Sequence, residues 1–196
     1  DILFGFQHAD ILQLFKVMDG LPVNVRLLDP PLHEFLPSSD EDIAALAQRI
    51  GKPAAKIRQI VEDMAEVNPM LGFRGCRLSV VYPEITAMQV RAIITAAVDA
   101  TEQGFKPYPE IMIPLVVNVR EIRLVTDIIE QAIREVLKGK TVSIPYKIGT
   151  MIETPRAALG ADRLADAVEF MSFGTNDLTQ MTYGFSRDDV GKFLPA

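Results

Sequence analysis

The feature that most constrains the fold of this chain is a repeated alternation of short apolar runs with longer amphipathic segments. The runs that have strand character are "VNVRLLD" (23–29), "GCRLSVV" (75–81), "EIMIPLV" (110–116), "YKIGTMIE" (146–153) and "VEFMSFG" (168–174). None alternates cleanly between apolar and polar residues, which is typical of strands covered on both faces in a parallel sheet. Strand-helix alternation of this kind predicts an α/β fold, and the number of units fits most of a (β/α)8 barrel.

The segments between the runs carry helix boundary signals. Ser38 and Glu41 form a candidate capping box, and Gly51 is a candidate stop for the same helix. Thr154 followed by Pro155 is typical of an N-cap and a first helical turn. The predicted helices cover residues 38–51, 52–69, 83–104, 119–139 and 155–167.

Composition excludes several classes of function. The chain has 196 residues and a net charge of −6, with no basic stripe, which argues against nucleic acid as the main partner. No apolar run reaches membrane-spanning length, and nothing at the start resembles a signal peptide. The single Cys76 excludes an internal disulfide and favours a reducing compartment. We therefore expect a cytoplasmic protein, or an organellar one in a eukaryote, with no membrane partner.

Polar residues stand where the predicted strands end. Asp29 follows Arg26 at the end of the first run, Glu153 ends the fourth, and Asp177 follows the fifth within "TND". Active sites of (β/α)8 barrels lie at the carboxyl ends of strands. Glu153 and Asp177 are 24 positions apart, about one helix-plus-strand unit, so both carboxylates could face one cation.

Plainer interpretations of the same residues remain open from the pattern alone. An Arg26–Asp29 pair at a strand end could be an ordinary structural ion pair. Glu153, next to Thr154 and Pro155, could simply stabilise the positive end of the following helix.

Several longer stretches resemble a known family. They are "VRLLDPPLHEFLP", "NPMLGFRGCRLSVVYPEI", "PEIMIPLV", "IGTMIETPRAAL" and "FMSFGTNDLTQMTYGFSRDD", in that order along nearly the whole chain. Together they resemble the phosphoenolpyruvate/pyruvate-binding barrel of the phosphoenolpyruvate-utilising enzymes, and within these the barrel of the pyruvate, phosphate dikinases. Phosphoenolpyruvate synthase and enzyme I of the sugar phosphotransferase system share the "GTNDLTQ" and "ETP" elements, whereas "LLDPPLHEFLP" separates the dikinases from both.

The resemblance implies a reaction and a cofactor. The domain would interconvert pyruvate and phosphoenolpyruvate with a phosphohistidine that another domain of the parent chain carries in. The overall reaction would convert ATP, phosphate and pyruvate into AMP, diphosphate and phosphoenolpyruvate. By motif match, Glu153 and Asp177 would be ligands of Mg²⁺ and would also contact substrate. Few, hard oxygen ligands are what Mg²⁺ accepts in proteins.

The same match gives roles to the other strand-end residues. Arg26 and Arg74 correspond to the phosphate-binding arginines of the family, and Asp29 corresponds to an active-site position that orients an arginine. These three form the expected catalytic set. Residues 174–176 (Gly174, Thr175 and Asn176) would line the substrate.

Some residues depart from the family pattern. Phe73 stands where the family usually has a histidine, which puts a polar role at that position in doubt. The family's acid/base cysteine belongs to a later glycine-rich motif that this sequence lacks, and we expect Cys76 to be a small core residue. The family's phosphorylated histidine belongs to another domain, so His8 and His33 are expected to be structural or exposed.

The resemblance also implies that residues 1–196 are one part of a longer enzyme. We expect an incomplete barrel, about strands two to six, without the nucleotide-binding and phosphohistidine domains, from a parent that is a homodimer. The isolated chain is expected to lack dikinase turnover. Two alternatives remain open: an enzyme of the phosphoenolpyruvate synthase or enzyme I type, and a catalytically dead binding or assembly module.

Overall fold

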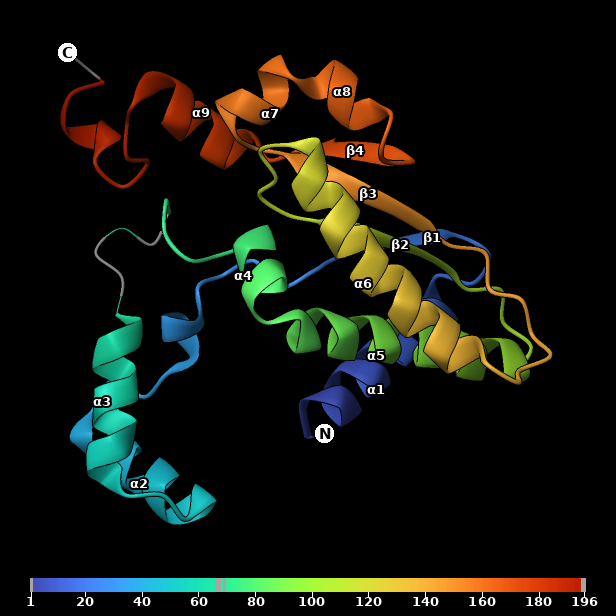
Figure 1. Cartoon of the computed structure of the whole chain (residues 1–196), viewed down its shortest axis with the longest axis horizontal. Coiled ribbons are helices and arrows are strands. Elements are labelled where there is room, and N and C mark those ends of the chain that lie inside the picture. Colours follow the sequence, from blue (N-terminus) through green and yellow to red (C-terminus); the bar gives the residue numbers. More distant parts are fainter. Residues whose placement is uncertain (1, 66–67, 69, 195–196) are drawn as a thin grey trace. The chain divides into compact units, whose positions relative to one another are not determined.

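The computed structural model describes residues 2–65, 68 and 70–194 of the chain (Figure 1). The chain divides into two compact units, one formed by Asp1–Asp29 and Gly75–Ala196 and the other by Pro30–Arg74. Each unit is described by itself below. Within the described residues, no helix has the length and apolar character needed to cross a membrane.

The first unit is built on a parallel sheet whose strands lie in the order in which they occur along the chain. The strands are β1 (Pro22–Arg26), β2 (Tyr108–Ile113), β3 (Lys147–Ile152) and β4 (Phe170–Phe173). Val25 is opposite Ile111 and Thr150 is opposite Met171, both in parallel register. Parallel strands joined by helices confirm the α/β class, and four such strands correspond to half of a (β/α)8 barrel.

One predicted strand is wrong. Residues 75–81 do not join the sheet, and Cys76–Val81 instead form the short helix α4. Since β1 pairs directly with β2, no strand can lie between them. A short apolar run cannot be assigned to helix or strand by periodicity alone, and the preceding Gly75, at φ 60°, turns the chain into the helix. The described sheet therefore has four strands where the sequence predicted five.

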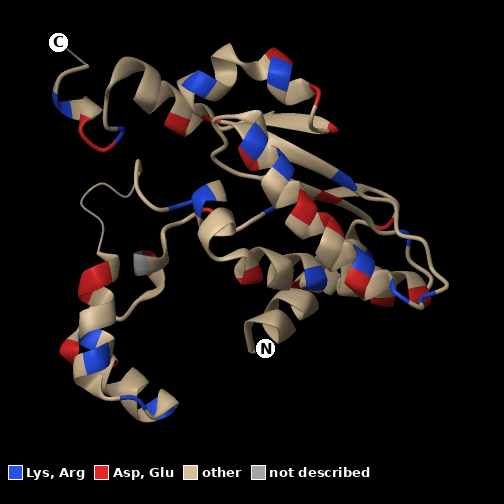
Figure 2. Ribbon diagram, in the orientation of Figure 1, with Lys and Arg blue, Asp and Glu red and all other residues tan. Residues whose placement is uncertain are grey.

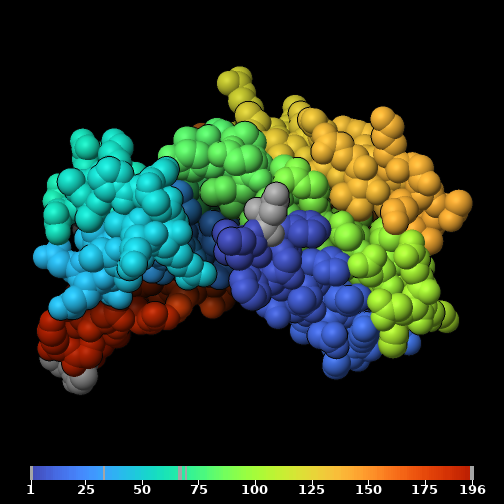
Figure 3. Space-filling model, turned by 90° about the horizontal axis from the view of Figure 1, so that it is seen from below, coloured from blue at the N-terminus to red at the C-terminus, as the bar shows by residue number. Residues whose placement is uncertain are grey.

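The first unit also contains three long helices. They are α1 (Ile2–Val17), α5 (Pro83–Glu102) and α6 (Val119–Leu137). Figure 3 shows α1, in blue, alongside α5, in green, and α6 packs against α5 (Figure 1). The predicted helices at 83–104 and 119–139 are confirmed. No helix was expected over residues 2–17.

The segments after β3 and β4 position the candidate site. Thr154 caps α7 (Pro155–Leu159) by accepting from Ala157 N, as predicted. The predicted helix over 155–167 is wrong in its length, because the chain is interrupted at Gly160 and resumes as α8 (Ala161–Ala165). After β4, α9 (Thr175–Tyr183) begins directly at the "TND" residues, and the short 3-10 turn η2 (Val190–Lys192) follows.

The second unit consists of the 3-10 turn η1 (Leu32–Phe35) and the helices α2 (Asp40–Ile50) and α3 (Ala54–Met64). Its small core contains Ile43, Ala47 and Ile57. Gly51 ends α2 in a left-handed conformation, as predicted. The N-cap is Ser39, which accepts from Asp42 N, so the helix is capped one residue later than the predicted Ser38. Residues 66–67 and 69 of the predicted 52–69 helix lie outside the described residues.

Candidate functional site

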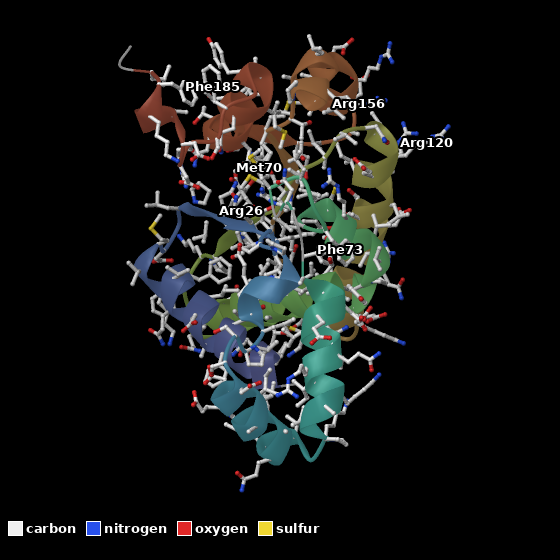
Figure 4. All side chains as sticks on the ribbon, turned by 90° about the vertical axis from the view of Figure 1, so that its left-hand side faces the viewer. Arg26, Met70, Phe73, Arg120, Arg156 and Phe185 are labelled. Atoms are coloured by element: carbon white, nitrogen blue, oxygen red, sulfur yellow. The ribbon has the colours of Figure 1, made fainter. Side chains whose placement is uncertain are left out.

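The carboxyl ends of the strands carry most of the residues singled out in the sequence. Arg26 is the last residue of β1, Glu153 follows β3, and Gly174 follows β4. Because the strands are parallel and neighbouring, these ends lie along one edge of the sheet. The position of Arg26 can be followed in Figure 4.

Glu153 is held firmly in place. It is 2% exposed, and its Oε1 accepts a 2.6 Å hydrogen bond from the backbone N–H of Leu115, which lies just beyond β2. The next residue ties the same two strand ends together, because Thr154 Oγ1 donates to the Val116 carbonyl oxygen at 3.2 Å. Burying a carboxylate costs free energy unless charges or hydrogen bonds compensate it. The hydrogen bond from Leu115 N supplies part of this compensation.

Gly174 lies directly against Glu153. A Cβ atom at position 174 would fall 2.5 Å from both the Cβ and the Oε2 of Glu153, so a larger residue could not occupy this position without displacing the carboxylate. Gly174 N also donates to the Ile152 carbonyl oxygen at 2.9 Å. The close approach of the backbone to the carboxylate therefore requires glycine.

Asp177 enters from the neighbouring strand connection. It lies in the first turn of α9, three residues after Gly174, while Thr175 and Asn176 open the same helix and are exposed. Glu153 and Asp177 thus come from segments that leave the adjacent strands β3 and β4 at the same edge. The structure places the two predicted metal ligands on neighbouring strand ends.

Arg26 and Asp29 form an ion pair. Arg26 Nη1 lies 3.3 Å from Asp29 Oδ2 and 4.0 Å from the Met151 sulfur. The Asp29 side chain is buried, whereas that of Arg26 is partly exposed. A buried carboxylate that holds a guanidinium restricts its rotation without using all five of its N–H donors. This contact agrees with both interpretations from the sequence: an ordinary structural ion pair, and an aspartate that orients an active-site arginine.

The remaining candidates are Arg74, His8 and His33. Arg74 ends the second unit, where its Nη1 is 3.4 Å from the Met70 carbonyl oxygen. His8 of α1 is 2.8 Å from Asp99 of α5, a structural contact between helices. The side chain of His33 lies outside the described part of the chain.

Cys76 is a core residue, as expected, although it lies on a helix. The thiol is fully buried, and its Sγ is 3.0 Å from the Leu115 carbonyl oxygen. Burial is the main cause that raises its pKa to about 12, with the Glu121 carboxylate as the next cause. A thiol in this state is a poor proton donor and a poor nucleophile near neutral pH.

The sequence did not indicate Leu115. Its φ of 53° is the one positive value at a non-glycine residue within the described chain, and its N–H binds the Glu153 carboxylate. A leucine in an apolar run carries no signal of such a conformation. The "PEIMIPLV" stretch that resembles the family includes Leu115 but gives it no role.

The described residues contain no group of three or more His, Cys, Asp or Glu side chains able to hold a metal ion. A cation bound by Glu153 and Asp177 would have two carboxylate ligands from the described part of the chain. Such a donor set fits Mg²⁺, which usually keeps several waters and binds proteins through one or two carboxylates. The close fit of Gly174 against the Glu153 carboxylate also leaves that group fixed at the edge.

The parallel sheet and its acidic strand-end cluster define a (β/α)8-barrel type of domain with its candidate site at the carboxyl edge. Residues 4–193 match the family described as "PEP-utilising enzyme, PEP-binding domain", and the chain belongs to this family.

Three similar proteins are all named pyruvate, phosphate dikinase. The chain is 54% identical over 197 aligned residues to pyruvate, phosphate dikinase 1, chloroplastic, of Arabidopsis thaliana, covering 100% of this chain and 20% of that protein. It is 55% identical to pyruvate, phosphate dikinase 2 of Oryza sativa subsp. japonica, with 100% and 22% covered. It is 52% identical to pyruvate, phosphate dikinase of Clostridium symbiosum, with 98% and 22% covered. The chain spans about a fifth of the length of these relatives.

Proposed function

We propose that this chain is the phosphoenolpyruvate-binding part of a pyruvate, phosphate dikinase. The parent enzyme would transfer a phosphoryl group between a phosphohistidine and pyruvate, giving phosphoenolpyruvate, at the overall expense of ATP and phosphate with release of AMP and diphosphate. Two findings support this: the identity of 52–55% to dikinases along the whole chain, and the family membership of residues 4–193. The "LLDPPLHEFLP" segment further favours a dikinase over the synthase and enzyme I types.

The observation that carries the proposal is the fixed, buried carboxylate of Glu153 at the carboxyl edge of the sheet. Glu153 and Asp177 would hold Mg²⁺ there, with Gly174 keeping the Glu153 carboxylate in position. When bound, Mg²⁺ supplies positive charge that favours the enolate form of pyruvate. The protein prepares the site by burying one ligand and delivering the second on the first turn of α9.

The arginines would bind the transferred phosphoryl group and offset its negative charge. Arg26, held by Asp29 at 3.3 Å, would bind phosphoryl oxygens through its remaining donors, and Arg74 would act as the second phosphate-binding arginine. Thr175 and Asn176, exposed at the start of α9, would donate hydrogen bonds to substrate oxygens. The buried thiol of Cys76 has no part in this proposal.

The remaining features belong to the parent protein. The phosphohistidine domain would be the partner of this edge, and the parent would act as a homodimer in the cytoplasm or in an organelle. The Arabidopsis relative carries the word "chloroplastic" in its name, which supports the organellar option for a plant parent. The 196-residue chain alone would have no dikinase turnover but would retain weak, Mg²⁺-dependent binding of phosphoenolpyruvate or oxalate.

Titration calorimetry with oxalate, in the presence and absence of Mg²⁺, tests this proposal. We expect oxalate binding to the chain to require Mg²⁺ and to disappear in Glu153→Gln, whose amide oxygen can still accept from Leu115 N. Glu135→Gln is the matched control, because Glu135 lies on α6 and accepts a hydrogen bond from Gln131 one turn earlier on the same helix. Mg²⁺-dependent binding that survives Glu153→Gln would contradict the assignment, and no binding in any form would favour a dead assembly module.

A further inference from the structure

An open cavity of about 690 Å³ lies between the start of α6 and the short helices α7 and α8. Three arginines from three different elements line it: Arg120 of α6, Arg156 of α7 and Arg163 of α8. Figure 4 shows Arg120 and Arg156 close to one another, near the residues where α6 and α7 begin. The cavity shares no residue with the predicted phosphoenolpyruvate site.

The arginines of this cavity differ from several others in the chain. Among the described residues, none of the three guanidinium groups forms an ion pair, whereas Arg26, Arg58, Arg134 and Arg187 each pair with a carboxylate. Asp162 is the one acidic residue on the cavity wall. The basic segments at the start of α6 and on α7 and α8 can be followed in Figure 2. In a chain of net charge −6, three arginines beside one acidic residue make this wall locally positive.

The backbone N–H groups at the start of α6 do not themselves form the anion site. Asn118 accepts from the N–H groups of Arg120 and Glu121, and the Glu121 carboxylate accepts from Val117 N and Asn118 N. These backbone donors are already satisfied by the capping box. An anion in the cavity would be bound by the side chains, in the planar geometry that lets guanidinium groups grip phosphate oxygens.

The cavity also has an apolar side. Val117, Val119, Leu159 and Leu164 line it, and Leu159 is 90% exposed. The volume is far larger than a bare phosphate requires and lies within the range of small-molecule sites. A ligand that contacts both the arginines and the apolar residues of the cavity carries a phosphate group and an apolar body.

We propose that this cavity binds a small organic phosphate, separately from the phosphoenolpyruvate site. Arg120, Arg156 and Arg163 hold the phosphate, and Leu159 contacts the apolar part of the ligand. Because α7 follows directly from Glu153 and Thr154, a ligand in this cavity touches the same helix that continues from the candidate metal ligand.

The probes are inorganic phosphate and phenyl phosphate, titrated calorimetrically into the chain in EDTA so that no divalent cation takes part. Phenyl phosphate should bind more tightly than inorganic phosphate. Replacing any of the three arginines by alanine should weaken both by roughly tenfold or more, since each removes charge-assisted hydrogen bonds. Leu159→Ser should weaken phenyl phosphate alone.

The controls separate this site from charge in general and from the phosphoenolpyruvate site. Arg123→Ala removes a neighbouring arginine of α6 that does not line the cavity, and it should leave binding unchanged. Arg26→Ala and Glu153→Gln should also leave it unchanged. The proposal is overturned if neither probe binds at millimolar concentration, if Arg123→Ala weakens binding as much as Arg120→Ala, or if binding disappears in Arg26→Ala. None of these outcomes bears on Mg²⁺-dependent oxalate binding.

Discussion

The carboxylate of Glu153 is bound by the backbone N–H of Leu115 at 2.6 Å, and Leu115 holds a left-handed conformation, φ 53°, to make this contact. Such a conformation costs a non-glycine residue about 1–2 kcal/mol. The strain is retained because the rest of the residue is engaged: its side chain is buried and its carbonyl oxygen is 3.0 Å from Cys76 Sγ. Leu115 therefore positions the candidate metal ligand through its backbone.

This strain gives a prediction about stability. Leu115→Ala should destabilise the chain by about 2–5 kcal/mol because it empties a buried site. Leu115→Gly removes the same side chain but relieves the left-handed strain, so it should be more stable than Leu115→Ala by about 1 kcal/mol. Urea unfolding measures both. At Leu78, buried on α4, the usual order should return, with glycine worse than alanine by about 1 kcal/mol. The same order at both positions would refute backbone strain at Leu115.

Gly174→Ala tests the contact that fixes Glu153. The new methyl group would meet Glu153 Cβ and Oε2 at 2.5 Å, so the carboxylate or the strand end must move. We expect Mg²⁺-dependent oxalate binding to fall by at least about tenfold, because a misplacement of roughly 1 Å is enough to disrupt a preorganised site. Gly5→Ala is the control: that glycine lies in α1 with open space around it, and the change should leave binding intact. Retained binding in Gly174→Ala would show that the close approach is not needed.

The strand-end residues could be predicted because their position follows from a simple rule. Once the runs ending at Arg26, Glu153 and Gly174 are read as parallel strands, their carboxyl ends must lie on one edge. The same reasoning failed for 75–81, because a short apolar run fits a buried helix as well as a strand. Leu115 could not be found either, since a left-handed leucine depends on tertiary contacts that its own sequence does not encode.

The cavity lined by three arginines could not be predicted from the sequence either. Arg120, Arg156 and Arg163 are dispersed along the chain, and only the packing of α6 beside α8 brings them to one wall. Arg156 lies within the "IGTMIETPRAAL" stretch, but nothing in that pattern assigns it to a phosphate-binding cluster. Clusters assembled from separate helices become visible only with the fold.

Helix α2 offers a test of its observed boundary. Ser39 Oγ accepts a 3.1 Å hydrogen bond from Asp42 N, so Ser39→Ala should destabilise the second unit by about 1 kcal/mol. Ser38→Ala, one residue earlier, should change stability by less than about 0.5 kcal/mol, as at ordinary surface positions. Amide hydrogen exchange of α2 reports each effect within that unit. The opposite order would restore the capping box at Ser38.

The buried thiol of Cys76 makes stability depend on alkaline pH. Its pKa rises from an ordinary value of 9.0 to about 12, chiefly through burial. Below the ordinary pKa the thiol is neutral in both folded and unfolded chains, so its contribution to stability is constant. Between these two values the unfolded chain releases the proton while the folded chain keeps it, so stability falls as pH rises.

Urea unfolding at a series of alkaline pH values, on wild type and Cys76→Ala, isolates this contribution. The wild-type free energy of unfolding should decline more steeply with pH than that of the variant. The comparison between variants is needed because Tyr146, whose pKa is also raised to about 12 by burial and by its hydrogen bond to Glu130, titrates in the same window. At roughly pH 8 the folded chain should resist a thiol reagent that reacts at once after denaturation, since the reagent requires an accessible thiolate. Equal pH slopes, together with rapid labelling of the folded chain, would show that Cys76 is accessible and titrates normally.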